Sequence, residues 1–311
     1  MSIRTIVLPL RATGQRGFVI VPVLWILMML ATLVGVLSVY LARSAVALAV
    51  NDDRLRVDAL VTAGLELTAY TLSSAAKQTR AQNGSFSFEL DRSRVSVRFA
   101  TEAARVDLNV APKPMLANLF RVLGADPRDA DQYADRVVGW RAPQRDTLDA
   151  ENALYRAAGA PYLPRGGAFA SVDELWLVLG IPAGLVDLAM PFITVFSGQS
   201  EISVLDAAPE VIAALPGMTP AIYEQFLKQR AILPRDDKAI ADALGEARKS
   251  AKSQGGATIR VVTEIQLDNG RRALNEAVIL LESGDSPYKI LSWRDDAEVS
   301  SLRKPPGGRL L

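Results

Sequence analysis

The chain has 311 residues, enough for one membrane segment and one or two domains of ordinary size. Its 35 lysines and arginines balance 34 aspartates and glutamates, so the net charge of +1 gives no strong field for nucleic acid or acidic partners. The chain has neither cysteine nor histidine, which excludes disulfides, thiolate metal sites and Ser-His-Asp or histidine–zinc catalysis. An enzyme that uses carboxylates or a Ser-Lys pair remains open, but it is the less favoured class.

A long uncharged segment lies near the N-terminus, between Arg16 and Arg43. Its apolar run, residues 18–41, has about 24 residues, and a helix needs roughly 20 to cross the core of a bilayer. Three arginines precede this run, whereas the first acidic residue is Asp52. This asymmetry predicts a single membrane-spanning helix with the N-terminus in the cytoplasm and the remaining chain outside it.

The residues around Gly17 differ from an ordinary secretory signal. No Ala-x-Ala-like site follows the apolar run, and Gly17 instead stands before it, directly after a basic residue. This layout resembles the class III leader of type IV pilins and pseudopilins. The resemblance implies a prepilin leader over residues 1–17, cleavage between Gly17 and Phe18 on the cytoplasmic side, and N-methylation of Phe18. The alternative is an uncut signal anchor in which Gly17 has no role.

The helix is expected to continue beyond the membrane. From Leu60 onwards, apolar or small residues recur at spacings of three and four, and Asn83-Gly84 is the first strong stop signal. The sequence therefore predicts a helix over residues 18–84 that is apolar all round in its first half and amphipathic in its second. We expect the amphipathic face, with Gly64 and Leu72, to pack against the helices of partner subunits. A coiled-coil stalk is the alternative, although no sustained heptad with flanking charges is present.

Strictly alternating segments predict an antiparallel sheet. Residues 85–99 alternate about a turn at residues 91–93, which predicts a half-buried hairpin able to cover the apolar face of the helix. Similar strands are expected over residues 258–267, 274–281 and 288–293, separated by turns at 268–270 and 283–285. The tail, residues 295–311, is expected to be disordered.

Between these strands the pattern is helical, and the linkers are rich in proline and glycine. We predict an inserted all-α domain over residues 111–200, and a pilin-like domain formed by residues 85–110 and 201–294. The fold class is therefore α+β, with a long N-terminal helix packed on an antiparallel β-sheet.

A weak internal repeat runs through the middle of the chain. Residues 106–112 resemble residues 202–209, and Asn109 and Asp206 are each expected to cap a helix. Each copy then reaches a glycine turn, at Gly124 and Gly217. A third such turn, at Gly180, closes a helix that begins with a capping box at residues 171–174.

These glycine turns resemble helix-hairpin-helix motifs, which grip DNA phosphates through a Gly-apolar-Gly hairpin. Here the second glycine is replaced by Asp126, Pro182 and Thr219. Asp126 would repel a phosphate, and Pro182 has no N–H to offer. We therefore expect packing units and no nucleic-acid partner.

With the leader, the long helix, the hairpin and the inserted domain, the chain is similar to the minor pseudopilin K family of type II secretion systems (general secretion pathway protein K). The most specific stretch is residues 160–178, whose proline-containing loop and Ser-Val-x-Glu-Leu helix start resemble those of the family. The resemblance implies no catalysis, but a position at the tip of the pseudopilus. There the subunit would help to start pseudopilus assembly and the export of folded proteins across the outer membrane.

The same resemblance implies partners and a location. The partners are the minor pseudopilins of the I and J types, the major pseudopilin, the prepilin peptidase and the inner-membrane assembly platform. The location is the bacterial inner membrane, with a single span, a cytoplasmic N-terminus and a periplasmic C-terminal domain.

Pro22 stands where most pilins carry a glutamate, at the fifth residue after the cleavage site. In the family, that glutamate neutralises a methylated terminal amine inside the apolar filament core, where burying either charge alone would be costly. Pro22 cannot form this pair. We therefore interpret Pro22 as the mark of a tip position, because a subunit with nothing above it has no amine to neutralise.

Calcium is the one cofactor that the resemblance suggests, held by acidic residues of the inserted domain. The remaining candidates are Asp146, Asp149 and Glu151, and two nearby arginines, Arg141 and Arg145, oppose a cation. Calcium takes six to eight oxygen ligands, several of them from carboxylates. The alternative is a solvated acidic loop without an ion.

Two other functions remain open. A minor pilin of a type IV pilus or competence system would have the same N-terminal design. A membrane-anchored periplasmic hydrolase would need paired carboxylates, for example Glu174 with Asp173, but a helix cap already accounts for these two residues.

Overall fold

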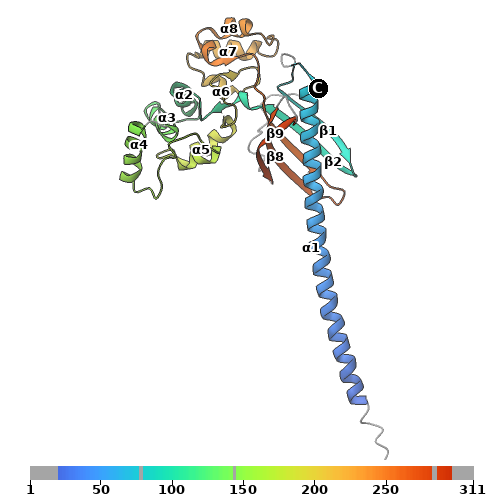
Figure 1. The fold of residues 1–311 in the computed structure, drawn as a ribbon. Coiled ribbons are helices and arrows are strands. Elements are labelled where there is room, and N and C mark those ends of the chain that lie inside the picture. The colour runs from blue at the N-terminus through green and yellow to red at the C-terminus, as the bar shows by residue number, and fades with distance from the viewer. Residues whose placement is uncertain (1–19, 77–79, 143–144, 282–285, 296–311) are drawn as a thin grey trace, which may run out of the picture. The chain divides into compact units, whose positions relative to one another are not determined.

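The computed structural model describes residues 20–76, 80–142, 145–281 and 286–295, with the side chains of residues 42–51 and 145–148 left out. The expected disordered tail thus lies outside the described residues, apart from its first residue. The chain divides into two compact units, residues 1–58 and 59–311. The α+β class is confirmed, because a long N-terminal helix is followed by an antiparallel sheet and a helical region (Figure 1).

The long helix, α1, spans Ile20–Ser74 and is shorter than expected. Arg80 Nε donates to the carbonyl of Leu72 at 2.8 Å, which satisfies one of the last carbonyls of the helix. The carbonyl of Gln82 accepts from the backbone N–H of Thr101 at 2.7 Å, and the first strand begins at the next residue, Asn83. The predicted end of the helix near residue 84 is therefore wrong, because these residues already belong to the sheet.

The sheet has five antiparallel strands in the order β1-β2-β7-β8-β9. The strands are β1 (Asn83–Leu90), β2 (Ser93–Thr101), β7 (Thr258–Gln266), β8 (Arg272–Leu281) and β9 (Tyr288–Asp295). The hairpin β1–β2 turns on Asp91 and Arg92 alone, both with positive φ, as the tightest hairpin turns require. The predicted strands are thus confirmed with small shifts at their ends, and the turn at 283–285 lies outside the described residues.

Helix α1 covers one face of this sheet with its amphipathic face. Leu60, Val61, Leu65, Thr68, Ala69 and Leu72 are all buried. Gly64 lies over Val97 of β2 and Thr263 of β7, which are directly opposite each other in the sheet. A Cβ at Gly64 would stand 3.2 Å from Val97 Cγ2, so a larger residue there would require the Val97 side chain to shift by a few tenths of an ångström. The expectation that this face packs against partner subunits is wrong, because the chain's own sheet needs it as cover.

A helical region fills the chain between β2 and β7. Its α-helices are α2 (Lys113–Val122), α3 (Pro127–Arg141), α4 (Arg145–Ala157), α5 (Ala183–Ala189), α6 (Pro209–Ala213), α7 (Pro220–Gln229) and α8 (Asp237–Leu244). Short 3₁₀ helices are η1 (Glu102–Ala104), η2 (Val172–Leu177), η3 (Met190–Phe192) and η4 (Gly245–Ser250). One buried apolar core runs through this region from Ala104 to Ala247. The expected domain boundary at residue 200 is therefore wrong, because residues 201–252 join this core and add no strand to the five-stranded sheet.

The helical region consists of two similar units. The first helical unit, residues 106–194, opens with β3 (Val106–Asp107) and closes with β4 (Ile193–Thr194), which pair in parallel. The second helical unit, residues 202–252, opens with β5 (Ile202–Ser203) and closes with β6 (Ala251–Lys252) in the same way. The same turn follows each opening strand. The backbone N–H of Ala111 donates to the backbone carbonyl of Asp107 at 2.9 Å, and that of Ala207 donates to the carbonyl of Ser203 at 3.0 Å. The weak sequence repeat corresponds to this repeated arrangement.

Asn109 and Asp206 do not cap helices, contrary to expectation. The N-caps of α2 and α6 are Pro112 and Ala208, neither of which makes a side-chain cap bond. The Asn109 side chain instead bonds the backbone of Phe169, and Asp206 accepts two hydrogen bonds from Arg235, at 2.7 and 2.8 Å. Both side chains hold distant segments together.

A buried charge cluster of Glu102, Arg105, Arg260 and Glu276 lies where the sheet meets the first helical unit. Arg260 of β7 bonds both oxygens of Glu102, at 2.7 and 3.0 Å, and one oxygen of Glu276 of β8, at 2.5 Å. Thr194 of β4 donates to the same Glu102 carboxylate. Burial alone would raise the pKa of Glu102, but the charge and hydrogen bonds of Arg260 outweigh it and lower the pKa to about 2.

We predict that Glu102→Gln lowers the free energy of unfolding by about 3–5 kcal/mol at pH 7, because Arg260 loses one of its two buried counter-charges and Arg105 loses a neighbouring one. In the wild type, stability should fall as the pH drops from about 5 towards 2, since the unfolded carboxyl takes up its proton near pH 4.3 and the folded one only near pH 2. Glu102→Gln should lack this part of the acid dependence. Urea unfolding followed by circular dichroism at a series of pH values measures both effects.

The control is Glu264→Gln, which removes an exposed carboxylate from β7, the strand that carries Arg260. It should change stability by less than about 0.5 kcal/mol. Equal losses in the two variants would contradict a stabilising role for the cluster.

Candidate functional site

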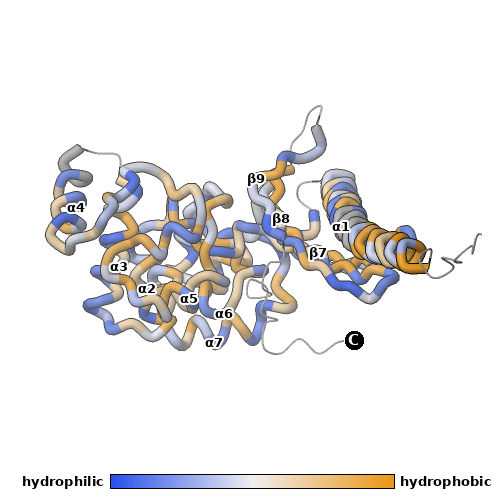
Figure 2. Tube along the Cα trace, turned by 90° about the horizontal axis from the view of Figure 1, so that it is seen from below, coloured by the Kyte–Doolittle hydropathy of each residue, from blue (hydrophilic) through white to orange (hydrophobic). Residues whose placement is uncertain are grey.

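The first segment of α1 is suited to cross a membrane. Residues Ile20–Leu41 form the one such segment found in the described part of the chain, with a mean hydropathy of 2.6 over 22 residues. Every side chain in this segment is exposed, and Figure 2 shows it as a hydrophobic stretch of the tube. At 1.5 Å per residue it is about 33 Å long, close to the roughly 30 Å of a bilayer core.

The predicted processing site, Gly17 and Phe18, lies outside the described residues, so cleavage and methylation stay predictions. Pro22 is the third residue of α1. In a chain that begins at Phe18, Pro22 would cost one hydrogen bond at the start of the helix, and its fixed φ is compatible with a helix.

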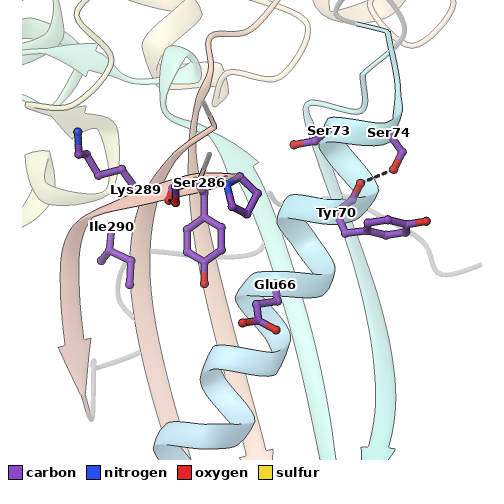
Figure 3. A pocket seen from close by; sticks show the side chains of 9 residues that line it. Glu66, Tyr70, Ser73, Ser74, Ser286, Lys289 and Ile290 are labelled. Carbon is purple, nitrogen blue, oxygen red and sulfur yellow. Dashed lines mark hydrogen bonds between the residues drawn. The ribbon is translucent and has the colours of Figure 1, made fainter. Parts of the chain in front are cut away.

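The outer side of α1 borders a groove with strand β9. The groove has a volume of about 860 Å³, and its lining includes Glu66, Tyr70 and Ser73 of α1 and Tyr288 and Ile290 of β9 (Figure 3). The amphipathic pattern did not point to these residues, because they lie on the polar side of the helix. Only the position of β9, far along the sequence, brings the two walls together.

The carboxylates Glu174 and Asp173 do not form an acid–base pair. Glu174 accepts hydrogen bonds from Trp140 Nε1 at 3.1 Å and from Arg165 Nε at 2.8 Å, while Asp173 pairs with Arg294 at 2.5 Å. Burial would raise the pKa of Glu174, but these hydrogen bonds outweigh it and lower the pKa. A carboxylate held in this way is a poor general acid, so the hydrolase hypothesis loses its candidate residues.

Trp140 packs against and hydrogen-bonds residues of the stretch 160–178, which carries the most specific part of the resemblance. Its ring lies 5.9 Å from that of Phe169 and 6.0 Å from that of Tyr155, and its N–H is bonded by Glu174. Ser171 caps the 3₁₀ helix η2 as expected, but Glu174 does not complete a capping box at Ser171, because Trp140 and Arg165 occupy it.

The predicted calcium ligands do not come together as a site in the part of the chain described here. Asp149 is exposed, and Glu151 is buried and forms an ion pair with Arg136 at 3.0 Å. The side chain of Asp146 lies outside the described residues. Among the described residues, no three carboxylates are grouped so that they could hold a metal ion. Calcium binding therefore stays a prediction, and Glu151 fits it poorly because its charge is already paired.

The three glycine turns have the backbone that sequence indicated. Gly124, Gly180 and Gly217 all have positive φ. Two of the residues that replace the second glycine act as helix N-caps, because Asp126 accepts from Arg128 N–H at 3.0 Å and Thr219 from Ile222 N–H at 3.3 Å. These caps occupy N–H groups that a phosphate would need, which supports a packing role.

A family model and a solved structure that resemble this chain agree with each other. Residues 97–198 match the family model of protein K of the type II secretion system (T2SS). The fold is similar to a chain in the crystal structure of the GspK-GspI-GspJ complex from the type 2 secretion system of enterotoxigenic Escherichia coli, with a TM-score of 0.60 and 15% sequence identity over 80% of this chain and 99% of that chain. A search of curated proteins found no match. The resemblance to protein K is thus confirmed by sequence over the first helical unit, and the structural match extends the likeness in fold over most of the chain.

Proposed function

We propose that this chain, a type II secretion system pseudopilin of the protein K type by its match over residues 97–198, works at the tip of the periplasmic pseudopilus. There it would help to start pseudopilus assembly and the export of folded proteins across the outer membrane. The observation that carries this proposal is the agreement between the family match and the structural likeness to a chain of a three-protein pseudopilin complex. A minor pilin of another machine is less well supported, since its leader and helix are common to all pilin-like proteins.

The proposed partners follow from the same complex. Its printed title names GspI and GspJ beside GspK, and we infer that this chain assembles with minor pseudopilins of those two types. The apolar segment of α1 would hold it in the inner membrane, with the N-terminus in the cytoplasm and the sheet and helical units in the periplasm. The prepilin peptidase, the major pseudopilin and the assembly platform would act on it or beside it during assembly.

The tip position rests on a charge argument about Pro22. A filament subunit that supplies a glutamate at this position neutralises the terminal amine of its neighbour, and in an apolar core an unpaired charge would cost several kcal/mol. A subunit with proline there cannot neutralise a neighbour above it. A subunit without this glutamate is therefore tolerated at the tip of the pseudopilus, where no further subunit is stacked on it.

The direct test of the proposed function is co-purification. We expect the full-length chain, extracted from membranes in mild detergent, to retain the I-type and J-type minor pseudopilins of the same cell. An unrelated single-span membrane protein with the same tag serves as the control. Retention of neither pseudopilin, or equal amounts on the control, would contradict the proposal.

A second prediction concerns processing. In cells with a prepilin peptidase, the intact mass of the extracted protein should correspond to a chain that begins at Phe18 and carries one methyl group. Gly17→Ala should leave most of the protein uncleaved, because the resemblance to the pilin family implies a peptidase that requires glycine directly before the cleavage site. Finding Met1 retained in the wild-type protein would exclude the pilin-like leader.

A third prediction separates a tip position from one within the filament. Pro22→Glu should leave secretion close to normal, because a carboxyl near the bilayer edge can take up a proton or pair with its own terminal amine. Pro22→Ala should also be tolerated, since in a chain that begins at Phe18 the proline costs the helix one terminal hydrogen bond, which alanine restores. The measurement is secretion of a native exoprotein, and the control is loss of the corresponding glutamate in the major pseudopilin, which should be severe. Loss of secretion in Pro22→Ala alone would mean that the proline itself is required.

A further inference from the structure

The groove between α1 and β9 exists because one helix is narrower than this sheet. A helix with its side chains is about 10 Å wide, whereas five strands spaced about 4.8 Å apart span about 19 Å. Helix α1 places Gly64 over β2 and β7, and β9 is an edge strand. The flank of the helix and the start of β9 therefore leave a groove of about 860 Å³ between them (Figure 3).

Glu66 is a carboxylate without a counter-charge in this groove. It is exposed, and it makes no hydrogen bond or ion pair with any described residue. The buried or half-buried glutamates Glu102 and Glu174, by contrast, are paired with Arg260 and Arg165. Lys289, the basic residue of the groove wall, has an interaction of its own, and in Figure 3 its ammonium group points away from Glu66. The described chain thus supplies no cation for Glu66.

Two tyrosines flank this carboxylate. Tyr70 is 73% exposed, one turn beyond Glu66 on the same helix. Tyr288 of β9 lines the same groove as Glu66, and burial and then the charge of Glu66 raise the pKa of its hydroxyl. Tyrosine is enriched in protein interfaces, and an aromatic ring attracts the cationic head and covers the apolar stem of a basic side chain.

We propose that this groove receives a basic side chain from a neighbouring pilin-like subunit, with Glu66 pairing its charge and Tyr70 and Tyr288 packing beside its stem. The inference rests on the proposed function, because that function supplies the neighbouring subunits. It adds a surface that is separate from the amphipathic face of α1, which is buried against the chain's own sheet.

Charge reversal at Glu66 tests the pairing. The full-length chain would be co-expressed with the I-type and J-type minor pseudopilins, extracted in detergent and assayed for the partner that it retains. Glu66→Arg should lower the retained amount about tenfold and Glu66→Gln about threefold, because the first adds repulsion and the second only removes attraction. Glu224→Arg, at an exposed carboxylate of α7, is the matched control and should retain the wild-type amount.

A photocrosslinker tests the location of the groove. With p-benzoylphenylalanine in place of Tyr70, we expect a covalent adduct with a pilin-like subunit, and the linked peptide should contain lysine or arginine. The same group in place of Ile232, which is 85% exposed after α7, should not give this adduct. An adduct with a second copy of the chain, with lipid or with an exported protein, or no adduct, would overturn the proposal.

The two proposals can fail separately. If the wild-type chain retains the minor pseudopilins while Glu66→Arg retains them equally well, the groove is not the contact and the proposed function stands. If the wild-type chain retains no pilin-like subunit, both proposals are overturned. Thermal melting of each variant by circular dichroism should match the wild type, because Glu66 and Tyr70 are exposed.

Discussion

The guanidinium of Arg260 lies buried between the carboxylates of Glu102 and Glu276. This contact joins the sheet to the segment that leads into the helical units. Glu102 follows directly after β2, at the point where the chain leaves the sheet for the helical units. Thr194, in the closing strand of the first helical unit, donates to the same carboxylate. Because a buried charge is costly without its partners, this cluster favours one arrangement of β7, β8, the exit from β2 and the first helical unit.

Helix α1 meets three different surroundings along and around one continuous element. Its first segment is apolar all round and exposed, as a membrane anchor would be. Its later segment packs Gly64 closely against the sheet, while Glu66 and Tyr70 remain exposed. This division leaves the outer flank of the helix, and not its amphipathic face, available for a neighbouring subunit.

In the helical units, the acidic residues that were candidates for catalysis or phosphate binding have structural roles. Glu174 holds Trp140 and Arg165 in place, and Asp126 caps α3. Glu174 thus has its charge paired with Arg165, and Asp126 accepts a hydrogen bond from a backbone N–H that a phosphate would need. This agrees with a subunit whose role is to assemble with other proteins.

The sequence alone determined the features that depend on local pattern. The apolar segment, the alternating strands and the glycine turns follow from side-chain periodicity and backbone preference, and each is present in the structure. The resemblance to protein K also came from residues close together in the chain. The tertiary structure alone decided which side chains meet: that Gly64 faces the chain's own sheet, that residues 201–252 join the helical core, and that Arg260 pairs with Glu102. These contacts join residues far apart in sequence, and a helical or strand period defines a face of an element without specifying what covers it.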